Sequence, residues 1–256
     1  MKSLEECVVL SVDGSDKGLY PFLPYILQDV WEIGSDPGVI AELIAGCFKK
    51  RRRPNVLDLG CGKGAVSIEI AKRLRCTCYG IDAIPEFIRI ANEKADEFGV
   101  KDLCTFEIGD MREAVPTLPV FDVIILGSIG PVFGNYRATL SALKKNLGPD
   151  GILIIDDGYI EDNRDYEHPS IMKRRDILDQ IRASGMRVIS ERIMNRDEIK
   201  KSDELIFGKL KRRCLELIEK HPDKRTLFED YLVKQVEEND VLENRVVCAT
   251  MVVRMK

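Results

Sequence analysis

The feature that most constrains this sequence is a turn in which glycine stands at every second position. Gly60, Gly62 and Gly64 follow the apolar run 56–59, and an amphipathic segment begins at Ala65. This order predicts a strand, a glycine turn and a helix. A turn without side chains lets a ligand lie against the main chain, and the free N–H groups at the helix start face that ligand. Glycine turns of this kind bind nucleotide-like cofactors in open α/β sheets.

The glycine spacing narrows the choice of cofactor. A dinucleotide turn has the pattern G-x-G-x-x-G and receives a pyrophosphate, whereas here Asp58 stands two residues before the first of three alternate glycines. A carboxylate suits a cationic group better than a pyrophosphate, because like charges repel. The run 57–64, Leu-Asp-Leu-Gly-Cys-Gly-Lys-Gly, closely resembles motif I of class I S-adenosylmethionine-dependent methyltransferases. The alternative is a tight turn that only needs small residues.

A second acidic residue follows at an informative sequence separation from the glycine turn. Asp82 ends a second predicted strand, 76–82, and lies 18 residues past Gly64, near the roughly 20-residue offset of the ribose-binding acid in dinucleotide folds. A carboxylate can accept hydrogen bonds from both ribose hydroxyls. The matching position of the family that this sequence resembles binds the ribose of S-adenosylmethionine. The alternative role for Asp82 is to cap the helix predicted at 85–98.

The resemblance continues along the chain. After a third strand at 104–108 the family has an acid that accepts from the adenine amino group and a residue that packs on the ring, and Asp110 and Met111 stand there. Asp110 could instead cap the next turn. Predicted fourth and fifth strands extend the resemblance to about residue 159. The predicted cofactor-binding residues are Asp58, Gly60, Cys61, Gly62, Gly64, Asp82, Ala83, Asp110, Met111 and Gly127.

The alternation of predicted strands and helices favours an α/β fold. We expect a Rossmann-like, seven-stranded, mostly parallel sheet with helices on both faces. We expect a single domain, with a helical cap at 1–53, a cofactor-binding core at 54–194, a helical insertion at 195–244 and a last strand at 245–256. Within the cap, the apolar residues of 19–31 predict a helix. The insertion departs from the family, which usually has a short hairpin there. It could be a substrate lid, a homodimer contact or an addition without function.

Composition limits the partners of the protein. The 256 residues carry a net charge of −4, so no overall charge attracts nucleic acid or an anionic membrane. No apolar run approaches the roughly 20 residues that span a bilayer, and the N-terminus lacks a signal-peptide core. We therefore expect a cytoplasmic protein. Eight cysteines without C-x-x-C spacing, and only two histidines, predict no metal site.

The resemblance implies a methyltransferase that uses S-adenosylmethionine and transfers the methyl group by in-line displacement. The cofactor carries the reactive group and the protein supplies orientation, so no catalytic triad is required and the catalytic residues stay unknown. His168 is a weak candidate for a base and Tyr159 for an acceptor contact, with Tyr25, Trp31 and Tyr166 as further aromatic candidates. We expect a small-molecule acceptor, because the surface is not basic.

Several alternatives stay open. An RNA or protein methyltransferase could use the basic clusters at 49–53 and 209–213. A non-catalytic scaffold could bind the cofactor, since fold alone does not grant activity. Asp156 and Asp157 would suit a metal-assisted catechol-type enzyme. That class requires a further carboxylate after the fourth strand, and this sequence has Gly127 and Ser128 there. The glycine spacing disfavours a nicotinamide oxidoreductase.

Overall fold

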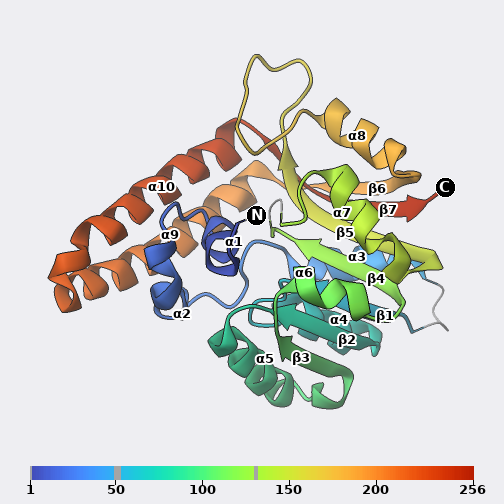
Figure 1. The fold of residues 1–256 in the computed structure, drawn as a ribbon, viewed down its shortest axis with the longest axis horizontal. Coiled ribbons are helices and arrows are strands. Elements are labelled where there is room, and N and C mark those ends of the chain that lie inside the picture. The colour runs from blue at the N-terminus through green and yellow to red at the C-terminus, as the bar shows by residue number, and fades with distance from the viewer. Residues whose placement is uncertain (1, 49–52, 130–131) are drawn as a thin grey trace. The chain divides into compact units, whose positions relative to one another are not determined.

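The computed structural model describes residues 2–48, 53–129 and 132–256, which form two compact units (Figure 1). The first unit comprises Met1–Trp31 and Met194–Val247, and the second comprises Glu32–Ile193 and Cys248–Lys256. Each unit therefore contains two segments that are distant in the sequence.

The second unit is built on a seven-stranded sheet with the order β3-β2-β1-β4-β5-β7-β6. Strands β1 to β5 pair in parallel, and β6 is antiparallel to β7. The predicted Rossmann-like, mostly parallel sheet is confirmed. The strands are β1 (Asn55–Leu59), β2 (Thr77–Asp82), β3 (Cys104–Ile108), β4 (Phe121–Gly127), β5 (Leu147–Tyr159), β6 (Met186–Ile193) and β7 (Val247–Met255).

Helices cover both faces of this sheet (Figure 1). From β1 the chain moves outward through β2 to β3, and from β4 it moves outward to β5 in the opposite direction. Because crossovers between parallel strands are right-handed, the helices of the two halves lie on opposite faces. The helices are α3 (Pro37–Cys47), α4 (Ala65–Leu74), α5 (Pro85–Glu97), α6 (Met111–Ala114), α7 (Tyr136–Leu143) and α8 (Arg174–Ala183), with 3-10 turns η2 (Lys101–Leu103), η3 (Val115–Thr117) and η4 (Lys144–Asn146).

The two halves of the sheet diverge between β1 and β4. Leu59 of β1 pairs with Leu126 of β4, so Gly60 and Gly127 follow at the same carboxyl edge. The side chains of 56–59 and 123–126 are buried, as expected for central strands with helices on both faces. In open α/β sheets the ligand lies outside the carboxyl ends of the strands at such a switch point.

The first unit is helical. It contains α1 (Leu4–Leu10), η1 (Lys17–Phe22), α2 (Leu23–Ile26), α9 (Arg196–Lys220), η5 (Pro222–Lys224) and α10 (Arg225–Asn244). The predicted helical insertion is confirmed, since α9 and α10 lie before the last strand. A helix over 19–31 is wrong: a 3-10 turn containing Pro21 precedes a single short α-helix there, because proline lacks the N–H that a continuous helix needs.

The basic cluster of the insertion is partly neutralised. Arg213 donates from Nε to Asp29 at 2.6 Å and Arg212 donates to the same carboxylate at 2.7 Å. These guanidinium groups hold the pKa of Asp29 well below its usual range. In the other cluster, at 49–53, positions 49–52 lie outside the described residues. In the described part of the chain, no helix combines the length and the apolar character that a bilayer crossing requires.

The packing around two glycines predicts a local loss of stability on substitution. A Cβ on Gly64 would lie 2.8 Å from the Phe106 ring, and a Cβ on Gly80 would lie 2.7 Å from the same ring. We expect Gly64→Ala and Gly80→Ala each to lower the free energy of unfolding by roughly 1–3 kcal/mol, because the buried ring must shift. At Gly64, a φ of +77° adds backbone strain to any side chain. Urea unfolding of each variant measures this.

The control for this experiment is Gly99→Ala. Gly99 has a φ of +67°, and no atom lies within 4 Å of an added Cβ. The free energy of unfolding of this variant should fall only by the cost of placing a side chain in the left-handed region, about 1 kcal/mol. In the Phe106→Leu background the cost of Gly80→Ala should shrink; an unchanged cost would show that the ring is not the obstacle.

Candidate functional site

The glycine turn between β1 and α4 has a fixed left-handed shape. Gly60, Gly62 and Gly64 have φ values of +72°, +54° and +77°, which glycine adopts without the steric cost that other residues bear. The N–H groups of Gly60 and Cys61 donate to the carbonyl of Ile81 at 2.8 and 3.1 Å. The turn is therefore held against the end of β2.

The two sides of this turn differ in what surrounds them. A Cβ on Gly60 would lie 2.5 Å from Cγ2 of Ile129 and 3.3 Å from Cε of Met111. A Cβ on Gly62 would meet nothing nearer than Ile33, at 4.0 Å. Gly60 is thus covered by side chains, whereas Gly62 borders open space in which a ligand can approach the main chain.

Asp82 stands beside the turn with its carboxylate oriented by the main chain. Its Oδ2 accepts from the N–H of Gly62 and its Oδ1 from the N–H of Ile84, both at 2.9 Å. Burial raises the pKa of Asp82, and these N–H donors together with that of Ala83 act against the rise. Ile84, not Asp82, is the N-cap residue of α5. The carboxylate thus joins the glycine turn to the end of β2.

Asp58 lies under the turn rather than in the open space beside it. Its side chain is buried, and its Oδ2 accepts from Oγ of Ser67 in α4 at 2.7 Å. Burial raises the pKa of Asp58 to about 6, and the nearby charge of Asp82 adds to the rise. The described contact of Asp58 is therefore with α4, where it fixes the strand to the helix.

Asp110 and Met111 lie at the end of β3, close to the same turn. Asp110 caps α6 by accepting from the N–H of Arg112 at 2.9 Å, and it also forms an ion pair with the Arg112 guanidinium at 2.6 Å. The guanidinium lowers the pKa of Asp110. Since the methyl of Met111 lies near Gly60, the structure brings both residues to the carboxyl edge.

The remaining predicted residues gather at this edge too. The thiol of Cys61 is buried, and burial, followed by the charges of Asp82 and Asp58, raises its pKa well above the usual value. Gly127 ends β4, and a Cβ there would lie 2.7 Å from Oγ of Ser35. Ala83 directly follows Asp82 in the chain.

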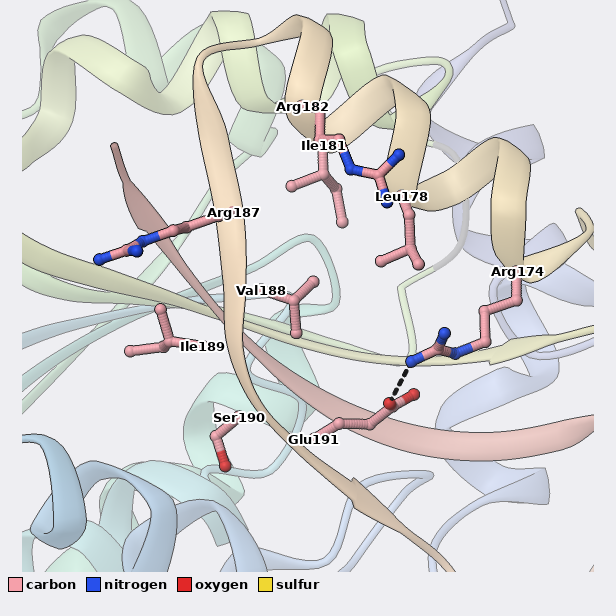
Figure 2. Close-up of a pocket in the computed structure, with 9 residues that line it drawn as sticks. All are labelled: Arg174, Leu178, Ile181, Arg182, Arg187, Val188, Ile189, Ser190 and Glu191. Atoms are coloured by element: carbon pink, nitrogen blue, oxygen red, sulfur yellow. Dashed lines mark hydrogen bonds and ion pairs between the residues drawn. The ribbon is translucent and has the colours of Figure 1, made fainter.

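The two catalytic candidates have structural partners elsewhere. Nδ1 of His168 accepts from the N–H of Ile171 at 3.2 Å and so holds its own loop. Tyr159 is buried, and the Arg174 guanidinium lies 5.6 Å from its ring centroid. Arg174 reaches from α8 to Glu191 on β6, forming a 2.7 Å ion pair (Figure 2).

This ion pair lines a pocket of about 400 Å³ between α8 and β6. The pocket contains none of the predicted cofactor-binding residues, and its lining is Arg174, Leu178, Ile181, Arg182, Arg187, Val188, Ile189, Ser190 and Glu191. In residues 2–48, 53–129 and 132–256 there is no group of three His, Cys, Asp or Glu side chains that could hold a metal ion.

Sequence reasoning missed several residues at the edge of the sheet. Lys63, inside the glycine motif, is buried and its ammonium lies 5.2 Å from the ring centroid of Phe87. A lysine in a turn gives no sequence signal of burial, because lysine is almost always exposed. Ser35 and Ser128, with hydroxyl oxygens 3.5 Å apart, come from segments far apart in the chain, so no local pattern reveals their contact.

Known proteins share the sequence pattern of the sheet and its turn. Residues 50–205 match a family model described as a methyltransferase domain. Over 99 residues the chain is 34% identical to a probable cobalt-precorrin-6B C(15)-methyltransferase (decarboxylating) from Methanothermobacter thermautotrophicus, covering 39% of this chain and 50% of that protein. Over 101 residues it is 31% identical to ajmaline N-methyltransferase from Rauvolfia serpentina, covering 36% and 35%. The chain thus spans half or less of the length of these relatives.

The fold has a similar counterpart among solved structures. A SAM-dependent methyltransferase from Geobacter sulfurreducens, crystallised in complex with S-adenosyl-L-homocysteine, superposes with a TM-score of 0.73 at 19% identity. The superposition covers 92% of this chain and 98% of that one.

Asp58 makes stability depend on pH in a defined direction. Its pKa in the folded chain, about 6, exceeds the ordinary value of 3.8, so the folded state binds this proton more tightly than the unfolded state does. Its contribution is therefore present at low pH and is lost as pH rises through about 6. Between about pH 4 and pH 7, Asp58→Asn should gain about 3 kcal/mol in free energy of unfolding relative to wild type.

Urea unfolding at several pH values measures this difference. Asparagine can still accept from Ser67, so the variant removes the charge and keeps the hydrogen bond. Asp102→Asn, at an exposed position, is the matched control, and its free energy of unfolding should depend on pH as that of wild type does. If the free energy of Asp58→Asn also follows wild type at every pH, the raised pKa assigned to Asp58 is wrong.

Proposed function

Because the chain belongs to the class I S-adenosylmethionine-dependent methyltransferase family, we propose that it transfers a methyl group from S-adenosylmethionine to a small-molecule acceptor. The observation that carries this proposal is the left-handed glycine turn at the switch point of the sheet, with the carboxylate of Asp82 bonded to its middle N–H group. Such a turn accepts the main body of a nucleoside cofactor against bare backbone.

The residues at this edge fit the cofactor. S-adenosylmethionine supplies an electrophilic methyl group on a sulfonium, and the protein supplies orientation. The turn at Gly60–Gly64 would hold the methionine part. Asp82 would accept from the ribose hydroxyls with the lone pairs that its bonds from the N–H groups of Gly62, Ile84 and Ala83 leave available. Asp110 would accept from the adenine amino group, with the Met111 thioether against the ring.

Any effect of Asp58 on the cofactor's amino group would be indirect. Its carboxylate is buried and bonded to Ser67, so its negative charge acts from beneath the turn. Cys61, Ala83 and Gly127 would line the site by their main chain and small side chains. His168 as a base and Tyr159 as an acceptor contact stay predictions.

Two observations support a small acceptor over RNA. Two of the relatives that the chain matches are named for methylation of a cobalt-precorrin and of ajmaline. In addition, Arg212 and Arg213 form ion pairs with Asp29. Their positive charge is partly neutralised, so less of it is available to bind a phosphate backbone. The cytoplasmic location, the homodimer contact through 195–244 and the single-domain arrangement stay predictions.

Calorimetric titration tests the cofactor site. Wild-type protein should bind S-adenosylhomocysteine and S-adenosylmethionine and should not bind NAD. Asp82→Ala should weaken both adenosyl ligands by roughly tenfold to a hundredfold, since it removes charge-assisted hydrogen bonds. Asp82→Asn keeps the shape of the side chain but can accept from only one of the two N–H groups at 62 and 84. Thermal unfolding of both variants should therefore show that they remain folded.

Asp102→Ala is the matched control, because Asp102 is an exposed aspartate on η2. It should bind as wild type does. If well-folded wild-type protein binds neither adenosyl ligand, the proposed function is wrong.

An acceptor screen tests the transfer itself. Release of S-adenosylhomocysteine should be measured with panels of small hydroxyl, amine and carbon acceptors, and separately with total RNA and with protein extract. We expect turnover with a small molecule, and its loss in Asp82→Ala. Turnover with RNA or protein alone would favour that alternative, and tight cofactor binding without turnover on any panel would favour a non-catalytic scaffold.

A further inference from the structure

Two Gly-Ser pairs that are distant in the sequence interlock at the carboxyl edge of the sheet. A Cβ on Gly34 would lie 2.7 Å from Cβ and 2.9 Å from Oγ of Ser128. A Cβ on Gly127 would lie 2.7 Å from Oγ of Ser35. Each glycine thus leaves the space that the serine of the other pair occupies, and we call these four residues the Gly-Ser clasp.

Asp156, at the same end of β5, holds the clasp together. Its main-chain carbonyl accepts from the N–H of Ser128 at 3.0 Å. Its buried carboxylate accepts from Oγ1 of Thr250 at 2.6 Å. Burial raises the pKa of this carboxyl group, and the hydroxyls of Ser35, Thr250 and Ser128 act against the rise.

Ser128 is held in a strained conformation. Its φ is +52°, a left-handed value that a residue with a Cβ adopts at a cost of about 1 kcal/mol or more. The hydrogen bond from its N–H to the carbonyl of Asp156 and the contact with Gly34 fix it there. Strain of this kind persists only where the surrounding structure over-determines the conformation.

The residue that follows Ser128 packs against the glycine turn. Ile129 follows Ser128, and its Cγ2 is the nearest atom to a Cβ on Gly60, at 2.5 Å. The backbone conformation of Ser128 therefore determines where the Ile129 side chain lies against the turn.

We propose that the Gly-Ser clasp is a positioning device for the cofactor site, in which Gly34 acts through Ser128 to hold Ile129 as the wall beside Gly60. This inference rests on the proposed function, since the ligand beside that wall is the adenosyl cofactor. Among the described residues, a Cβ on Gly34 would meet only Ser128, so Gly34 acts through that residue and is a positioning residue.

Substitution at Gly34 tests the device by titration calorimetry with S-adenosylhomocysteine. Gly34→Ala should weaken binding about tenfold or more, because the new Cβ displaces Ser128. Gly99→Ala is the matched control: its φ of +67° is also left-handed, but an added Cβ there meets nothing within 4 Å. Gly99→Ala should bind as wild type does, and thermal unfolding should show that both variants remain folded.

A second substitution separates positioning from general damage. Ser128→Gly removes the Cβ and Oγ with which the methyl group introduced by Gly34→Ala would collide, and glycine suits the φ of +52°. The double variant Gly34→Ala/Ser128→Gly should therefore recover most of the affinity of Ser128→Gly alone.

The outcomes are distinguishable. If wild type fails to bind S-adenosylhomocysteine, the proposed function fails and this inference with it. If wild type binds and Gly34→Ala matches Gly99→Ala, or if Gly34→Ala weakens binding as much in the Ser128→Gly background as it does in wild type, only the clasp is refuted.

Discussion

The left-handed turn between β1 and α4 is the constraint on which the carboxyl edge of the sheet depends. Its N–H groups bond to the end of β2 through Ile81 and Asp82, and its last glycine begins α4. Because those bonds require the backbone to stay in a region that side chains disfavour, the turn, the second strand and the helix are fixed as one piece. A ligand there meets a surface already formed, which reduces the ordering cost of binding.

Close packing extends this fixed piece to its neighbours. Glycine leaves a gap where other residues carry a side chain, and at four of these glycines a neighbour fills it: Phe106 at Gly64 and Gly80, Ile129 at Gly60, and Ser128 at Gly34. Protein interiors are packed as densely as organic crystals, so these contacts leave little freedom. The hydroxyl-bonded carboxylate of Asp156 gives the same rigidity to the end of β5.

Much of this arrangement could be predicted from the sequence because its signals are local. The strand, glycine turn and helix at 56–75 and the acid ending the next strand depend on neighbouring residues, and the right-handed crossover rule then places the strands. The structure at 19–31 was not predictable by spacing alone, since Pro21 overrides the apolar pattern. The Gly-Ser clasp rests on contacts between distant segments, which periodicity does not report. Asp58 and Ser67 are only nine residues apart, but their spacing does not show that the carboxylate lies beneath the turn.

The ring of Phe106 fills the gaps left by both Gly64, in the turn, and Gly80, in β2. The ring thus occupies space that two side chains would otherwise need. Cys61 also lies 2.8 Å from a Cβ on Gly80, and Gly64 has a φ of +77°. A homologous sequence with a side chain at position 80 is therefore expected to carry smaller residues at both 61 and 106, whereas position 64 is expected to stay glycine.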